Sequence, residues 1–386
     1  MFFMFICYPL FSQDSIVFIQ SMLVNNGYEN VSVRLEDDRY VITVEDNQYR
    51  FVADGIHEIL NLIRTTTGGI GTTVFFLKNG IPQFQLDFNT NDTTLNKSGN
   101  LKYPEDKIWR TMVKNKTRFS NKSFLKSDLV IYPQLYFRNA NFDKIYHLQF
   151  NIAPALELSL WKGCLMTTQI ILPVKNELEV EGDRIRPGFL TLNQQFRLKP
   201  NWYFNVIAGN FNQYRYGISA QIRHPFGQSD WTLNLRGDLT GSSYFTETGW
   251  QAGKVEILTG EAGVEYYYER FQLQMNLSIA SYLNNDMGLR ADCTRHFGEK
   301  TIGFYFVYGD MPLNGGFNFS VPISSVKRDR KKGIRVRAAK YYALEYNTST
   351  AGNQQQYFDT APNQNNSESW HHPSFLQFEL NQKSIQ

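Results

Sequence analysis

Six histidines are the residues of this chain that could carry acid–base or metal chemistry: His57, His147, His224, His296, His371 and His372. A hydrolytic site needs a nucleophile with a base within reach, and a zinc site needs closely spaced His and Cys ligands. His147 and His296 fall on the polar sides of predicted strands, but no acid–serine constellation accompanies them in the sequence. We therefore predict no catalytic residue, no metal site, no cofactor and no enzymatic activity. The alternative to a protein without enzymatic activity is a hydrolase built on a β-barrel that uses His147 and His296.

The three cysteines, Cys7, Cys164 and Cys293, show no zinc-like spacing. We interpret Cys164 and Cys293 as isolated strand residues rather than as a disulfide. The glycine-rich stretch Thr66–Gly71 does not open a helix after a strand, which argues against a phosphate loop. A net charge of +3 gives no reason to expect nucleic acid as a partner. The basic run Lys327–Lys332 is predicted to be a solvated turn.

The segment Phe271–Ile279 alternates strictly between apolar and polar residues. Successive side chains of a strand point to opposite faces, so one face of this strand is apolar and the other polar. The same pattern recurs through the second half of the chain. Aromatic residues make up 15% of the sequence, and outer-membrane barrels use aromatic side chains in girdles at both membrane interfaces. A soluble β-rich protein with aromatic cross-strand pairs is the alternative.

The predicted fold class is mainly β: a transmembrane antiparallel β-barrel of about 12–16 strands with a small N-terminal α+β periplasmic domain. The barrel strands are expected from Leu129 onward, near 145–160, 164–174, 186–198, 201–210, 213–223, 230–239, 258–268, 271–282, 287–297, 300–309, 316–323, 333–347 and 373–381.

The links between these strands alternate between short and long. We number the links in chain order from the first barrel strand, at Leu129, and call this number the rank of a link. Short links at 161–163, 199–201, 269–270 and 298–300 all have even rank. Long links at 175–185, 240–257 and 348–372 all have odd rank. Short periplasmic turns and long extracellular loops would produce this order. The even links 224–229 and 324–332 are longer than the rule allows.

Before the barrel, helices are predicted at Ile16–Asn26 and Gly55–Ile63, the second capped by Asp54. Strands are predicted at 31–35, 40–44, 49–51, 73–77 and 82–88, with a type I′ turn at Asn79-Gly80. The predicted organisation is a signal peptide at 1–13, the α+β domain at 14–90, a linker at 91–127 and the barrel at 128–386.

Alternation predicts a set of charged side chains that line the barrel lumen: Arg215, Arg223, Arg236, Asp238, Glu261, Glu265, Arg290 and Asp292. Mixed charge could guide a polar or anionic polymer. The same residues could equally form charge pairs that only fill a narrow barrel.

The segments Met287–Phe306 and Gly315–Ile323 resemble the C-terminal barrel of the YjbH-like exopolysaccharide and capsule outer-membrane proteins. The resemblance rests on Arg295 to Phe297, on Gly303-Phe304, and on Gly316-Phe317 with Pro322-Ile323. The segments Tyr49–Ile63 and Lys78–Pro82 are similar to the small domain that precedes such barrels. The resemblance implies an outer-membrane component of polysaccharide secretion or capsule assembly, without enzymatic residues.

The predicted function is therefore secretion or assembly of exopolysaccharide or capsule in the cell outer membrane. The expected partners are outer-membrane lipid, polysaccharide and periplasmic secretion proteins. Two alternatives stay open: a general porin-like solute channel, and a structural or adhesin-like barrel that acts through the loops 240–257 and 348–372.

Overall fold

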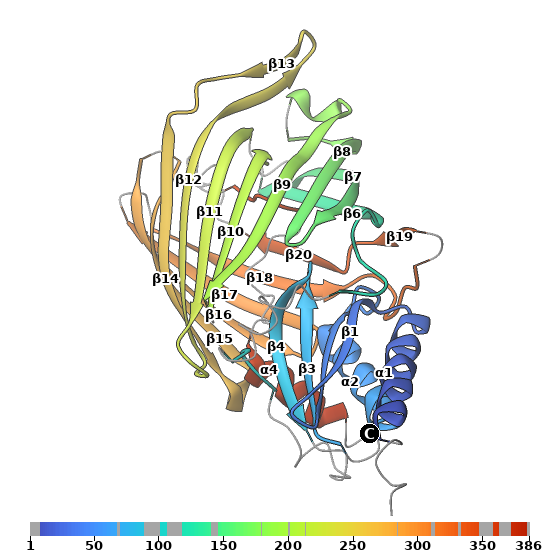
Figure 1. The fold of residues 1–386 in the computed structure, drawn as a ribbon. Coiled ribbons are helices and arrows are strands. Elements are labelled where there is room, and N and C mark those ends of the chain that lie inside the picture. The colour runs from blue at the N-terminus through green and yellow to red at the C-terminus, as the bar shows by residue number, and fades with distance from the viewer. Residues whose placement is uncertain are drawn as a thin grey trace, which may run out of the picture.

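The computed structural model describes residues 8–67, 70–88, 101–105, 118–139, 146–178, 180–199, 201–212, 214–283, 285–309, 313–330, 333–346, 358–362 and 372–383. The fold is mainly β, with a small α+β unit at its N-terminal end, as predicted (Figure 1). Within the described residues, no helix is both long enough and apolar enough to cross a membrane.

The α+β unit is built around a five-stranded sheet of order β1-β2-β3-β4-β5. Its elements are α1 (Tyr8–Asn25), β1 (Glu29–Glu36), β2 (Arg39–Glu45), α2 (Val52–Arg64), β3 (Thr72–Lys78), β4 (Ile81–Phe88) and β5 (Leu101–Lys102). Helix α2 connects the parallel pair β2 and β3, and the other pairs are antiparallel. The apolar side of α2 packs into the core through Ile56, Ile59 and Ile63, because these residues recur at helical spacing.

Several local predictions for this unit are confirmed, and others are wrong. Asn79 and Gly80 both have positive φ, which fits the predicted type I′ turn. Helix α1 begins at Tyr8, eight residues before the predicted helix start at Ile16. Helix α2 is preceded by Phe51 rather than capped by Asp54, which lies in its first turn. Tyr49 forms only an isolated bridge to Lys327 instead of the predicted strand 49–51.

The second sheet contains fifteen strands among the described residues. They are β6 (Ser127–Asn139), β7 (Tyr146–Trp161), β8 (Cys164–Asn176), β9 (Arg186–Lys199), β10 (Trp202–Asn210), β11 (Arg215–Pro225), β12 (Trp231–Thr246), β13 (Gly249–Ala252), β14 (Ile257–Tyr268), β15 (Leu273–Ser281), β16 (Met287–Phe297), β17 (Lys300–Gly309), β18 (Asn314–Pro322), β19 (Ile334–Ala338) and β20 (Tyr341–Tyr346). Short 3-10 turns η1 (Val180–Asp183) and η2 (Glu269–Phe271) lie between strands.

From β6 to β18 the main strands pair in chain order and antiparallel, and the sheet curls around an interior (Figure 1). Hairpin β12–β13 extends beyond it at the end opposite the α+β unit. The first and last strands of this series, β6 and β18, both pair with one later segment of the chain. Strand β19 pairs parallel with β6, and β20, only two residues later, pairs antiparallel with β18. The order of paired strands thus starts at β19 and ends at β20, so the described edge strands do not close a ring by pairing with each other.

The two faces of this sheet differ in chemistry. Along β16, Met287, Leu289 and Phe297 are exposed, while Arg290 and Asp292 between them are buried. We call the face that carries Arg290 the inner face and the opposite one the outer face. The alternation predicted for 271–279 holds from Leu273 onward, since Phe271 lies in η2.

The last predicted strand, 373–381, is wrong, because Pro373–Lys383 forms helix α4. Proline is favoured at the first position of a helix. Phe375, Leu376 and Leu380 are buried in the same core as α2 and the β1–β5 sheet. This core also contains Tyr267 of β14, so α4 joins the α+β unit to the large sheet (Figure 1).

Candidate functional site

One end of the curled sheet is capped by the α+β unit, and hydrogen bonds and ion pairs cross this junction at several places (Figure 1). The turns that reach the unit are the even-ranked links. Asn79 of the β3–β4 turn accepts a hydrogen bond from Gly163 N in the β7–β8 turn, at 2.7 Å. Tyr203, at the start of β10, donates its hydroxyl to Gln83 O at 3.2 Å. Successive hairpins therefore contact the same small unit.

The remaining links continue this contact around the unit. Gln228 in the β11–β12 link bonds both backbone groups of Tyr103, at 2.8 and 3.0 Å. Arg328 N in the β18–β19 link donates to Gln48 O at 3.0 Å. These two links are the ones that looked too long in the sequence. Both carry residues that reach the unit, so a contact function explains the extra length.

Arg50 is the anchor of the unit on the β16–β17 turn. Its Nε and Nη2 bond both carboxylate oxygens of Glu299, at 2.5 and 2.7 Å, and its Nη1 donates to Ser324 O. The side chains of Arg50 and Glu299 are 10% and 19% exposed. The hydrogen bonds to Glu299 raise the pKa of Arg50. Two-point guanidinium–carboxylate pairing fixes orientation as well as distance.

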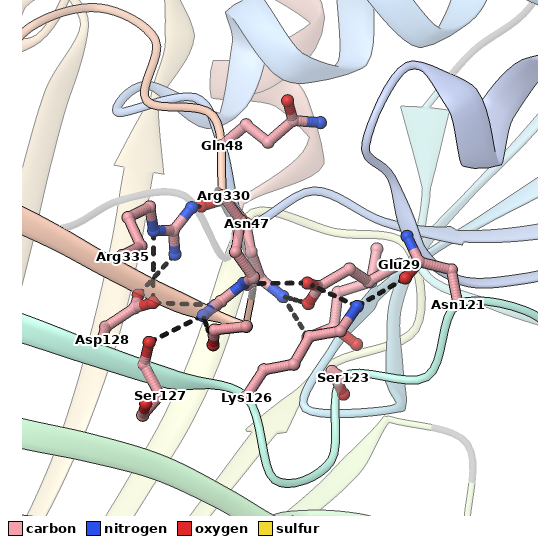
Figure 2. A network of polar contacts seen from close by, with 12 residues as sticks. Glu29, Asn47, Gln48, Asn121, Ser123, Lys126, Ser127, Asp128, Arg330 and Arg335 are labelled. Carbon is pink, nitrogen blue, oxygen red and sulfur yellow. Dashed lines mark hydrogen bonds and ion pairs between the residues drawn. The ribbon is translucent and has the colours of Figure 1, made fainter.

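Where β1, β6 and β19 meet, charged side chains form one continuous network (Figure 2). Glu29 of β1 accepts from Lys126 at 3.0 Å and from Arg330 at 3.2 Å. Arg330 also pairs with Asp128 of β6 at 2.7 Å, and Asp128 pairs with Arg335 of β19. The side chains of Glu29 and Arg335 are each only 4% exposed. The prediction that the basic run 327–332 is a solvated turn is therefore wrong for Arg330.

The eight predicted lumen residues all lie at inner-face positions of β11, β12, β14 and β16. Asp238, Glu265, Arg290 and Asp292 are buried. The other four, Arg215, Arg223, Arg236 and Glu261, are partly buried.

Several of these charges are paired with each other. Arg290 contacts Asp292 at 2.7 Å and Glu345 of β20 at 2.9 Å. Arg236 contacts Asp238 at 2.9 Å. Arg223 lies 4.3 Å from the centre of the Tyr203 ring, which is a cation–π distance. For Arg290 and Arg236 the geometry favours the charge-pair interpretation over a free charged lining.

Sequence reasoning missed the inner-face contacts of α4. His372, just before the helix, pairs with Glu265, and Glu265 also accepts from Gln274 Nε2 at 2.7 Å. Gln274 Oε1 lies 3.0 Å from His296 Nε2. Pro373 and the spacing of Leu376 and Leu380 could have indicated the helix. Its position inside the sheet had no signal in the sequence.

The described residues contain no group of three or more His, Cys, Asp or Glu side chains that could hold a metal ion. Cys164 and Cys293 are both free, as predicted, with Cys164 buried and Cys293 exposed.

Comparison with known proteins addresses the region that holds the predicted lumen residues. Residues 180–336 match a family described as exopolysaccharide biosynthesis protein YbjH. The predicted resemblance to the YjbH family is confirmed. The YjbH-like region runs from η1 into β19 and contains all eight predicted lumen residues. The similar segments Tyr49–Ile63 and Lys78–Pro82 lie outside it. No curated protein and no solved structure matched the chain.

Proposed function

We propose that this protein is an outer-membrane β-barrel that takes part in the secretion or assembly of an exopolysaccharide or capsule. The main observation in favour of a barrel is that the two faces of the large sheet differ in polarity, with apolar side chains on the outer face and polar ones on the inner face. Ile218, Leu277 and Phe304 are 53%, 54% and 66% exposed on three different strands. A continuous apolar outer face is costly in water and is matched by the hydrocarbon core of a membrane.

Strand length supports the same proposal. A membrane-crossing strand needs about 9–11 residues. Strands β10, β15 and β18 have 9 residues each, and β7 and β12 have 16. The main strands are thus long enough to cross.

Aromatic pairs on the outer face mark the two ends of the sheet. Trp202 and His224 stack at 4.2 Å at the capped end, where Trp231 and Tyr266 also meet at 4.5 Å. Tyr214 and Tyr244 stack at 5.0 Å at the opposite end. Two aromatic zones separated by an apolar band fit the interfaces of a bilayer.

Closure of the barrel would run through the β19–β20 segment. Ala339 N donates to Ile131 O of β6 at 2.9 Å, and Ile323 N, just after β18, donates to Lys340 O at 3.2 Å. The two residues between β19 and β20 thus bond to opposite edges of the sheet. The segment covers Ser127–Ile131 of β6 and Phe317–Pro322 of β18. Such pairing would be favoured in a membrane, because bilayers penalise unpaired backbone strongly.

The polysaccharide part of the proposal rests on the family match, and the α+β unit would then face the periplasm and bind secretion partners. A clean deletion should reduce or shorten surface polysaccharide, and the wild-type chain supplied in trans should restore it. Normal polysaccharide in the deletion strain would overturn this part. The buried side chains on the inner face do not favour the open-porin alternative.

A second candidate, a barrel that acts through its surface, is favoured by hairpin β12–β13. Tyr244, Phe245 and Trp250 on it are 48%, 39% and 46% exposed. Removal of residues 244–252 would abolish the phenotype if this candidate is right. Under the export proposal, polysaccharide would still reach the surface.

A further inference from the structure

The described parts of the C-terminal segment lie against the inner face of the large sheet. Strand β20 runs away from the α+β unit and ends at Tyr346, which pairs with Phe317 of β18, whereas α4 lies beside the unit (Figure 1). Between them, Phe358 and Thr360 are 5% and 0% exposed. The expectation that 348–372 is a surface loop is thus wrong for residues 358–360.

The first anchor of this segment lies towards the far end of the sheet. Asn212 Nδ2 donates to Asp359 Oδ2 at 2.8 Å, and Asp359 N donates back to Asn212 Oδ1 at 2.6 Å. The Phe358 ring stacks on Phe211 at 5.5 Å. Arg236 covers the same ring at 4.7 Å and donates to Phe358 O at 3.2 Å. This reciprocal and specific pairing holds a short piece of chain inside the sheet.

The second anchor lies at the capped end. His372 pairs with Glu265 and stacks on Tyr267 at 5.3 Å, and Ser374 donates to Asp230. Lys383, in the last turn of α4, pairs with Asp54 of α2 at 2.5 Å. Because the apolar side of α4 is also part of the α+β core, this anchor is the stronger of the two.

The inner face of the sheet is polar. The side-chain oxygens of Asn205, Ser278, Thr301 and Asn318 are buried and have no hydrogen-bond partner among the described residues. Buried amide and hydroxyl oxygens without partners are normally satisfied by water. Such a lining would hydrate readily once space opened beside it.

We propose that residues 358–362 and 372–383 form an internal plug that keeps the barrel closed and is released first at the Asn212–Asp359 anchor. The inference rests on the proposed barrel, since only a closed wall needs a plug. Release of the far anchor would leave α4 in place on the α+β unit and expose the polar inner face to water. The plug would then act as a regulatory part of the export route.

The test is the reactivity of an interior cysteine in the full chain. Ser278→Cys, made with the three native cysteines changed to serine, places a thiol at a position 1% exposed on the inner face. Asn212→Ala removes the far anchor. The matched control is Asn193→Ala, at an inner-face asparagine on β9 whose side chain makes no hydrogen bond within the described part of the chain. The probe is a small water-soluble methanethiosulfonate applied to outer membranes.

Asn212→Ala should raise the labelling rate of Cys at position 278 about tenfold, the factor expected for loss of two hydrogen bonds. Asn193→Ala should leave the rate unchanged. Equal labelling rates for Asn212→Ala and Asn193→Ala in a membrane-inserted chain would contradict the proposed plug but not the proposed barrel. Absence of the parent chain from the outer membrane would overturn the barrel and the plug together.

Discussion

Arg50 of the α+β unit and Glu299 of the β16–β17 turn form a two-point ion pair between residues 249 positions apart in the chain. The pair shows how the unit and the sheet are held as one body. Their side chains are largely shielded from water, so neither is free to move to another partner without cost.

Substitution Glu299→Gln should loosen the unit from the sheet. Removing one partner of a shielded pair costs about 1–3 kcal/mol. Hydrogen exchange should speed up at the amides of Arg50 and Arg328, which bond across the junction. The pair Lys175–Glu177, whose lysine side chain is 56% exposed, serves as control, and Lys175→Ala should change local stability by less than about 0.5 kcal/mol. Equal effects of the two substitutions would contradict the anchoring role of Glu299.

Alanine substitutions at two turn glycines of the capped end should lower the free energy of unfolding by very different amounts. Gly163 and Gly227 have φ of +78° and +63°, so an alanine at either pays about 1 kcal/mol of backbone strain. At Gly163 an added Cβ would lie 2.3 Å from Gln195 O, whereas at Gly227 nothing lies within 4 Å. Gly163→Ala should therefore destabilise the folded chain by about 1–3 kcal/mol more than Gly227→Ala in urea unfolding. Similar losses for the two variants would show that the close approach at Gly163 is not rigid.

Glu45 should make the stability of the α+β unit depend on pH. Burial raises the pKa of its carboxyl, although bonds from Asn30 and Gly80 N oppose the shift. A raised pKa means that the folded state binds the proton more tightly. The stabilisation is thus fully present below the unfolded pKa and is lost as pH rises through the folded one.

The measurement compares wild type with Glu45→Gln, which cannot titrate. The free energy of unfolding of the wild type minus that of the variant should fall as pH rises above the ordinary pKa of a glutamate carboxyl. A difference that rises with pH would mean that the hydrogen bonds outweigh burial.

A charged substitution at an exposed apolar position should destabilise the folded chain only where that position contacts lipid. Leu277 of β15 and Val17 of α1 are 54% and 61% exposed. Leu277→Lys should cost about 2–4 kcal/mol in refolding from urea into bilayers, because lipid cannot solvate the ammonium group. Val17→Lys should be nearly neutral, since α1 would lie in water. If both substitutions were neutral, the outer face would not contact hydrocarbon.

Much of the fold could be predicted from the sequence because strand alternation is a local signal. Residues 273–281 and 287–297 reveal their two faces through residue type alone. The helix α4 was missed because its segment also contains alternating apolar residues. The segment β19–β20 was predicted as one strand at 333–347, and only tertiary pairing shows that its two halves bond to different edges of the sheet.

The candidate site was less accessible to sequence reasoning. Alternation placed Arg290 and Asp292 at inner-face positions, but their partner Glu345 lies on a strand more than fifty residues later. Likewise, Asn212 and Asp359 meet only because the chain returns into the sheet after β20. Pairings between distant segments depend on three-dimensional closure, which no local pattern encodes.

The most direct test of the proposed membrane barrel is the orientation of the chain in the outer membrane. With the native cysteines replaced by serine, Thr248→Cys on the β12–β13 hairpin and Asp37→Cys on the β1–β2 turn would be exposed to a membrane-impermeant maleimide in intact cells. Only position 248 should be labelled in intact cells, and position 37 should become reactive once the outer membrane is permeabilised. Equal labelling at both positions before permeabilisation, or at neither position in a chain found in the soluble fraction, would contradict the membrane barrel.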